Sequence, residues 1–181
     1  MRWRDEKRGT PAVLAGSFAA LLAAGGLAGC GPYSFTGSSL PAHIETLAVP
    51  IFENETLELE IADEVTEAVT QRFLSDNRLR IVGESRADAI LEGTVTSYEN
   101  KVYNYSADET PLDYIVVLRL TARFRDLGKN RDLWNEEAMT ASAVYSVTAE
   151  GDRELTTEEE ARERAIAELA EDFLARTMEQ W

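Results

Sequence analysis

The chain has 181 residues, of which 44% are hydrophobic, and it carries a net charge of −15. Its length suits one domain with a real core, and its acidity excludes nucleic-acid binding by bulk electrostatics. The single cysteine, Cys30, and the single histidine, His43, exclude an intramolecular disulfide, a cluster of soft metal ligands and most Ser–His or Cys–His catalysis. We therefore expect neither a cofactor nor a metal. His43 precedes an apolar run and is interpreted as a strand-entry residue.

The N-terminal segment has the pattern of a bacterial lipoprotein signal peptide. A positively charged start is followed by an uncharged run at residues 12–27, which is shorter than the ~20 residues of a membrane span. The run ends in "LAGC" at residues 27–30, which matches the lipobox, where the cysteine is diacylated and the chain is cleaved before it. We predict a signal peptide at 1–29 and lipidation of Cys30. The alternative is an ordinary buried cysteine in an N-terminal membrane helix.

The predicted lipid would anchor a chain that is otherwise expected to be soluble, because several acyl chains hold firmly where one does not. Gly31 follows the cysteine, and under the enterobacterial sorting rule the absence of Asp at this position favours the outer membrane. Without residues 1–29 the chain keeps 14 basic and 31 acidic residues, a net charge of −17. Residues 30–42 are rich in Gly, Pro and Ser and indicate a lipidated tether, which leaves a single domain at 43–181.

The domain is predicted to follow the order β-α-β-β-β-β-α. Its first half is predicted to contain a strand at 43–52 with Pro50 at an edge or bulge, a turn at 53–56, a helix at 57–76 and a short strand at 77–83. Its second half is predicted to contain three longer strands and a helix, at 87–105, 112–126, 133–147 and 158–181. Thr157 and Glu160 indicate a capping box at the start of the last helix. We expect a two-layer α/β sandwich, with both helices on one face of a four- to five-stranded mixed or antiparallel sheet.

The start of the mature chain contains an ordered set of short motifs. A Cys is followed by Gly, Tyr and Phe, then by a linker and a strand that ends in Val-Pro-x-Phe-x-Asn-x-Thr. The residues concerned are Cys30, Gly31, Tyr33, Phe35, Val49, Pro50, Phe52, Asn54 and Thr56. This set resembles the LptE family of lipopolysaccharide-assembly lipoproteins, with Pro32 as an interruption of the Cys-Gly-Tyr pattern. The resemblance continues in "ADAILEGTVTSY", in "LTARFRDLGKNRDLWNEE" and in the acidic, Ala-rich last helix.

The resemblance implies a non-enzymatic function at the outer membrane. Members of the family are anchored in the inner leaflet of that membrane and sit largely inside the barrel of LptD. There they act as a plug, help the barrel to assemble and bind lipopolysaccharide on its way to the surface. The expected partners are thus an LptD-type barrel, lipopolysaccharide and, through the lipid anchor, the periplasmic side of the outer membrane. The alternative is a generic periplasmic lipoprotein scaffold that assists the assembly of another outer-membrane or secretion complex.

Three arginines on one strand are the candidate ligand-binding residues. Arg119, Arg123 and Arg125 share the strand face opposite its apolar residues. Because the arginine fork matches phosphate geometry, they suit the phosphates of lipid A, which the resemblance implies as a ligand. The alternative is that they pair across the hairpin with Glu136 or Glu137.

Four tyrosines near the predicted loop at 106–111 are the candidate partner interface. Tyr98, Tyr103, Tyr105 and Tyr114 each combine a large apolar ring with a polar tip, which is typical of interface residues. The alternative is that they are ordinary strand aromatics.

Overall fold

The computed structural model describes residues 40–149 and 154–179, within a compact unit that spans Gly37–Trp181. Cys30, the signal peptide and most of the tether lie outside the described residues. The described elements are, in chain order, β1 (Thr46–Ala48), β2 (Glu53–Asn54), α2 (Ile61–Asp76), β3 (Arg80–Ile81), a 3-10 turn η1 (Glu84–Arg86), β4 (Ala89–Tyr105), β5 (Pro111–Asp126), β6 (Arg131–Ser146) and α3 (Glu158–Glu179).

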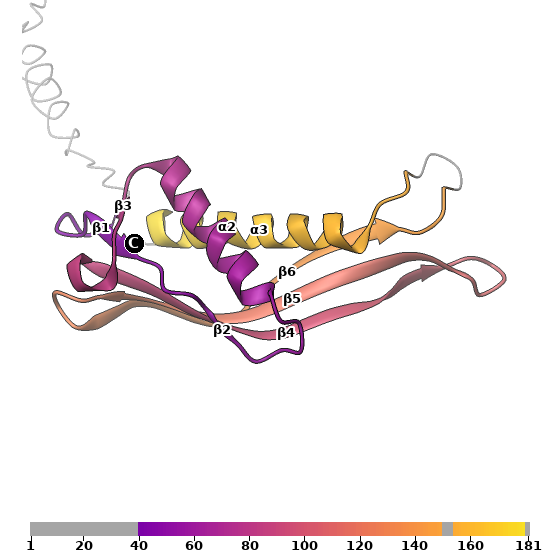
Figure 1. Ribbon diagram of the computed structural model, residues 1–181, viewed down its shortest axis with the longest axis horizontal. Helices are drawn as coiled ribbons and strands as arrows, with labels where there is room; N and C mark the ends of the chain where they lie inside the picture. The colour runs from indigo at the N-terminus through magenta and orange to yellow at the C-terminus, as the bar shows by residue number, and fades with distance from the viewer. Residues whose placement is uncertain (1–39, 150–153, 180–181) are drawn as a thin grey trace, which may run out of the picture. The chain divides into compact units, whose positions relative to one another are not determined.

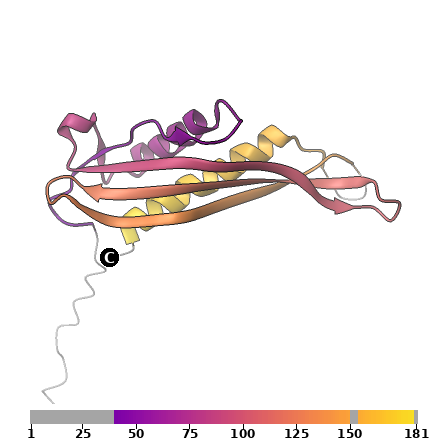
Figure 2. The same cartoon turned by 90° about the horizontal axis from the view of Figure 1, so that it is seen from below.

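The strands form one mixed sheet of six strands. Five follow the order β3-β1-β4-β5-β6, and β2 pairs with β4 beside this path. β1 runs parallel to both β3 and β4, whereas β4, β5 and β6 form a long antiparallel meander. Both helices lie on the same side of this sheet (Figure 1), and the opposite face is seen from below in Figure 2. The predicted two-layer α/β sandwich and its layout are confirmed, and the two-residue strand β2 adds a sixth strand to the predicted four or five.

The structure corrects the first half of the prediction in detail. The first strand is limited to Thr46–Ala48, because Pro50 has no N–H to donate to a continued ladder. The predicted turn contains β2, which pairs with β4 at the Glu53–Thr94 register. The helix begins at Ile61 rather than at residue 57, since residues 54–58 form a hydrogen-bonded loop instead. The predicted capping box of Thr157 and Glu160 is confirmed, with bonds of 2.9 and 3.1 Å.

The core lies between the helices and the meander. α2 buries Val65, Val69 and Phe73, and α3 packs against α2 and along β5 and β6. Phe173 of α3 is central, with its ring centroid 5.6 Å from that of Phe52 and 6.2 Å from that of Trp134. This packing fixes where the segment before α2 crosses the sheet.

Phe52 crosses directly over a glycine of β4. A Cβ added to Gly93 would lie 2.5 Å from the Phe52 ring, so only glycine leaves room for this approach. The backbone N–H of Phe52 donates to the hydroxyl of Thr66 on α2 at 2.9 Å. Phe52 therefore contacts both the sheet, at Gly93, and the helical layer, at Thr66. These contacts fix the position at which the loop before α2 begins.

Candidate interaction site

The three predicted arginines form ion pairs with carboxylates of β4. Arg119 Nη1 lies 2.5 Å from Glu99, Arg123 Nη2 lies 2.9 Å from Glu92, and Arg125 Nη2 lies 3.9 Å from the same Glu92. The antiparallel register places Glu92 directly opposite Arg123, which explains the choice of partner. The arginines thus pair with carboxylates, as the alternative states, but these carboxylates belong to β4 and are neither Glu136 nor Glu137.

Glu136, one of the two carboxylates named in that alternative, faces the helical layer instead. A register shift in the β5–β6 ladder places Glu136 opposite Ala122, whose side chain belongs to the core face. There it accepts a hydrogen bond of 2.6 Å from Arg176 of α3. Sequence periodicity alone does not reveal such a shift, because one extra residue moves a side chain to the other face.

The open face of the sheet therefore carries alternating charges. Arg119 and Lys101 both bond the carboxylate of Glu99 and lower its pKa to about 2. Arg125 keeps a buried Nε–H without a hydrogen-bond partner among the described residues. A ligand phosphate on this face would have to compete with Glu92 and Glu99 for these arginines.

The four predicted tyrosines separate into two pairs. Tyr98 is half-buried and donates to Glu158 of α3 at 2.8 Å, and burial together with this carboxylate raises the pKa of its hydroxyl. Tyr114 stacks on Tyr145 with ring centroids 5.5 Å apart. Tyr103 and Tyr105, near the end of β4, expose 61% and 56% of their surfaces. The exposed pair is available to a partner, whereas Tyr98 and Tyr114 hold the strands and α3 together.

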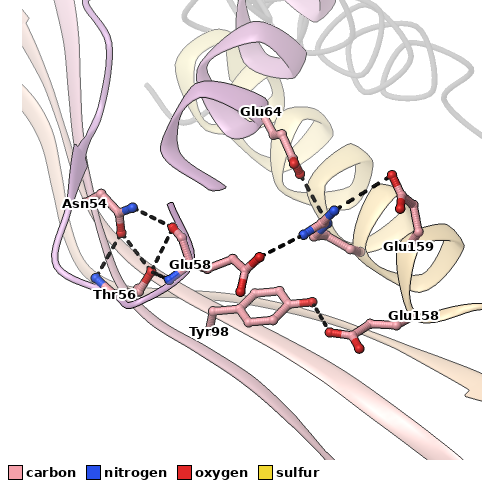
Figure 3. A network of polar contacts seen from close by, with 8 residues as sticks. Asn54, Thr56, Glu58, Glu64, Tyr98, Glu158 and Glu159 are labelled. Carbon is pink, nitrogen blue, oxygen red and sulfur yellow. Dashed lines mark hydrogen bonds and ion pairs between the residues drawn. The ribbon is translucent and has the colours of Figure 1, made fainter. Parts of the chain in front are cut away.

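A polar network that the sequence analysis did not find lies between the loop before α2 and the start of α3 (Figure 3). Its centre is Arg162, whose side chain is 17% exposed and faces Glu58 and Glu64 at 3.3 Å each and Glu159 at 3.8 Å. Burial raises the pKa of Glu64, and the neighbouring Arg162 opposes that rise. One cation thus joins the loop, α2 and α3.

The loop itself is held by its own side chains. Asn54 Oδ1 accepts from the N–H of Thr56 at 2.9 Å and from its hydroxyl at 2.7 Å, and Asn54 Nδ2 donates to the carbonyl of Glu58 at 2.7 Å. The N–H of Glu58 donates to the Thr56 hydroxyl at 3.1 Å. An Asn two residues before a Thr is the available sequence signal for such a turn, since both side chains bond nearby backbone.

The loop presents two leucines to solvent. Leu57 is 99% exposed and Leu59 is 88% exposed, the two highest values among the large hydrophobic residues of the described chain. A groove of about 300 Å³ lies beside the loop and is lined by Leu57 and, on β4, by Thr96 and Tyr98. This combination defines the candidate interaction site: a rigid, acidic loop with an apolar tip next to a groove.

The described residues contain neither a possible membrane span nor a possible metal centre. No helix within 40–149 and 154–179 is both long and apolar enough to cross a membrane. Within the same ranges, no group of three or more His, Cys, Asp or Glu residues is placed to hold a metal ion.

Solved structures from several bacteria share this fold. A Xanthomonas campestris protein is 12% identical with a TM-score of 0.57, and the match covers 77% of this chain and 89% of that one. A hypothetical protein of Chlamydia trachomatis is 12% identical with a TM-score of 0.51, covering 74% and 95%. A minor lipoprotein of Acinetobacter baumannii is 15% identical with a TM-score of 0.50, covering 76% and 92%. Among curated proteins, no significant match was found.

The fold and the site define a small two-layer α/β domain with an open, charged sheet face and a rigid acidic loop. A family model described as lipopolysaccharide-assembly, LptE, matches residues 44–177. The chain therefore belongs to the LptE family of lipopolysaccharide-assembly proteins, as the motifs from Cys30 onward indicate.

Proposed function

We propose that this chain is a non-enzymatic outer-membrane lipoprotein that supports the assembly of an LptD-type barrel, plugs it and takes part in delivering lipopolysaccharide to the cell surface. The family match over residues 44–177 is the observation that carries this proposal. The lipobox that ends at Cys30 supplies the anchor, with residues 1–29 as signal peptide and 30–42 as tether on the periplasmic side.

The barrel partnership is tested by isolating the complex. The chain and the LptD-type barrel encoded in the same genome are produced together, extracted from outer membranes and purified through a tag on the chain. We expect a stable, roughly equimolar complex. Depletion of the chain should lower the amount of assembled barrel and make the outer membrane permeable to large antibiotics. Recovery of no barrel after crosslinking in membranes would contradict the proposal and leave the generic scaffold.

The exposed tyrosines are proposed to be part of the contact with the barrel. Tyr103 and Tyr105 lie near the end of the β4–β5 hairpin, where their rings are accessible and can bury apolar area against a partner. Replacing both with Ser should weaken the complex. In this proposal Tyr98 acts through the position of β4 against α3, and Tyr114 acts through the packing of β5 against β6, since both side chains already have contacts within the chain.

Lipopolysaccharide binding is proposed for the arginines of the open face. Replacing Arg119, Arg123 and Arg125 with Ala should spare the complex but weaken lipopolysaccharide binding, because the guanidinium groups would bind lipid A phosphates. The ion pairs lead to a second prediction, in which lipopolysaccharide binding becomes stronger. Glu92→Gln with Glu99→Gln should strengthen binding, since the competing carboxylates are neutralised. Unchanged binding in both variants would assign the arginines to a structural role only.

Lipidation of Cys30 is tested by mass spectrometry of the membrane-extracted protein. The intact mass should exceed that of residues 30–181 by the mass of the acyl groups. Cys30→Ala should leave the chain unprocessed or release it from the membrane. A mature chain that starts elsewhere would contradict the lipoprotein assignment.

A further inference from the structure

The strongest unexplained feature of the domain is the exposure of Leu57 and Leu59 on a loop that its own side chains hold by hydrogen bonds. Single apolar side chains on a surface are ordinary, but these two lie within three residues and are almost wholly in water. Neither contributes to the core cluster. Their exposure therefore has no explanation in the stability of the domain.

The loop is fixed on both sides. Before it, β2 pairs with β4, and the N–H of Glu55 donates to the carbonyl of Val95 at 2.9 Å. After it, Glu58 is held both by Thr56 and by Arg162. A loop ordered in this way loses less backbone conformational entropy on binding, which is how preorganised interaction sites gain affinity.

The charge around the leucines restricts the partner. Glu53, Glu55, Glu58 and Glu60 surround them in sequence, and residues 53–60 contain no basic residue. The nearest cation of the network, Arg162, already faces three carboxylates. An anionic lipid surface would be repelled, whereas an apolar pocket with a basic rim matches both the leucines and the surrounding carboxylates.

We propose that Leu57 and Leu59 form a docking tip that inserts into an apolar pocket of a partner protein, with Lys or Arg side chains of that partner facing Glu55 and Glu60. The groove between the loop and β4 receives the partner surface next to the tip. The identification of this partner as the LptD-type barrel rests on the proposed function.

The test compares binding of full-length lipidated variants to the purified barrel. Leu57→Asp with Leu59→Asp should lower affinity at least about tenfold, while Leu57→Met with Leu59→Met should bind like wild type. Leu74→Asp and Leu155→Asp are matched controls on other exposed leucines and should change affinity less than about twofold. Because Leu57 and Leu59 are almost wholly exposed, their variants should keep the wild-type melting temperature. The melting temperature of every variant, including the half-exposed Leu74→Asp control, is measured alongside.

The charge requirement is tested separately. Glu55→Lys with Glu60→Lys should weaken binding about fivefold or more, and the loss should shrink as salt is raised, since salt screens the repulsion from a basic rim. A gain of affinity would contradict the proposal that Lys or Arg side chains of the partner face Glu55 and Glu60.

Photo-crosslinking locates the partner directly. A crosslinker at position 57 should capture the barrel in membranes, and one at position 74 should not. Lipid adducts alone at position 57, or equal binding by the double Asp variant, would overturn the docking tip while leaving the proposed function intact. If the wild-type chain itself bound no barrel, this result would instead contradict the proposed function and, with it, the identification of the barrel as the partner.

Discussion

The two faces of β5 differ in burial and in the kind of contacts that their side chains make. Leu118, Leu120 and Phe124 are fully buried beneath the helices, whereas Arg119 and Arg123 lie on the open face and pair with carboxylates of β4. The alternation arises from the two-residue period of a strand. The covered side of this strand therefore contributes to the core, whereas the open side carries exposed ion pairs, and substitutions on the covered side should cost more stability.

The largest effect is expected from a charge on the covered face. Leu118→Asp should lower the free energy of unfolding by about 4 kcal/mol or more, because it buries a carboxylate without a partner. Thr140→Asp is the matched control at an exposed position of β6, opposite Arg119, and should change the value by less than ~0.5 kcal/mol. Urea unfolding followed by circular dichroism measures both. A similar loss in the two variants would contradict the assignment of the faces.

An intermediate effect is expected where Phe52 crosses β4. Gly93→Ala should cost about 1–3 kcal/mol, because its Cβ enters the space of the aromatic ring. The same change in a Phe52→Leu background should cost less, since the smaller side chain can make room. Gly83→Ala, where a Cβ would meet nothing within 4 Å, is the control and should be near neutral. Denaturant midpoints of the four variants measure the coupling, and an equal cost of Gly93→Ala in both backgrounds would exclude the steric cause.

The smallest effect is expected from the polar network that joins the helices. Arg162→Met should cost about 1–2 kcal/mol near neutral pH, because it leaves Glu58, Glu64 and Glu159 facing one another. The pKa of Glu64 is already raised by burial and should rise further without the arginine, so its protonation favours the folded state. The cost should therefore decrease as the pH falls toward the ordinary glutamate pKa of about 4.5.

Urea unfolding at two pH values measures this change. Arg72→Met, which removes an exposed pair with Glu171, is the control and should stay within ~0.5 kcal/mol at both. A cost of Arg162→Met that grows on acidification would show that the carboxylates are not the cause.

Periodicity predicted the fold well where strands and helices are long. The alternation in β5 and the apolar stripe of α3 identify their covered faces directly, and the Thr157 capping box marks a helix start by chemistry alone. The segment from Pro50 to Ile61 was predicted less well, because local side-chain hydrogen bonds of Asn54 and Thr56 compete there with helix formation.

The candidate site was predicted in part only. Arg119 and Arg123 were placed on the correct face, but their partners depend on strand register and on a shift near Glu136, neither of which periodicity determines. The Arg162 network depends on the packing of α3 beside the loop before α2. Glu58 and Glu64 lie far from Glu159 and Arg162 in the sequence, so no local pattern predicts that the two groups meet.

The position of β1 determines how the domain bears a mechanical load. β1 is the first strand of the described fold and is hydrogen-bonded along both edges, to β3 and to β4. The carboxylate of Asp88, just before β4, also accepts hydrogen bonds from the N–H groups of Glu45 and Thr46. A pull applied to the tether along the axis of β1 therefore loads these bonds together in shear, which resists force better than peeling an edge strand one bond at a time.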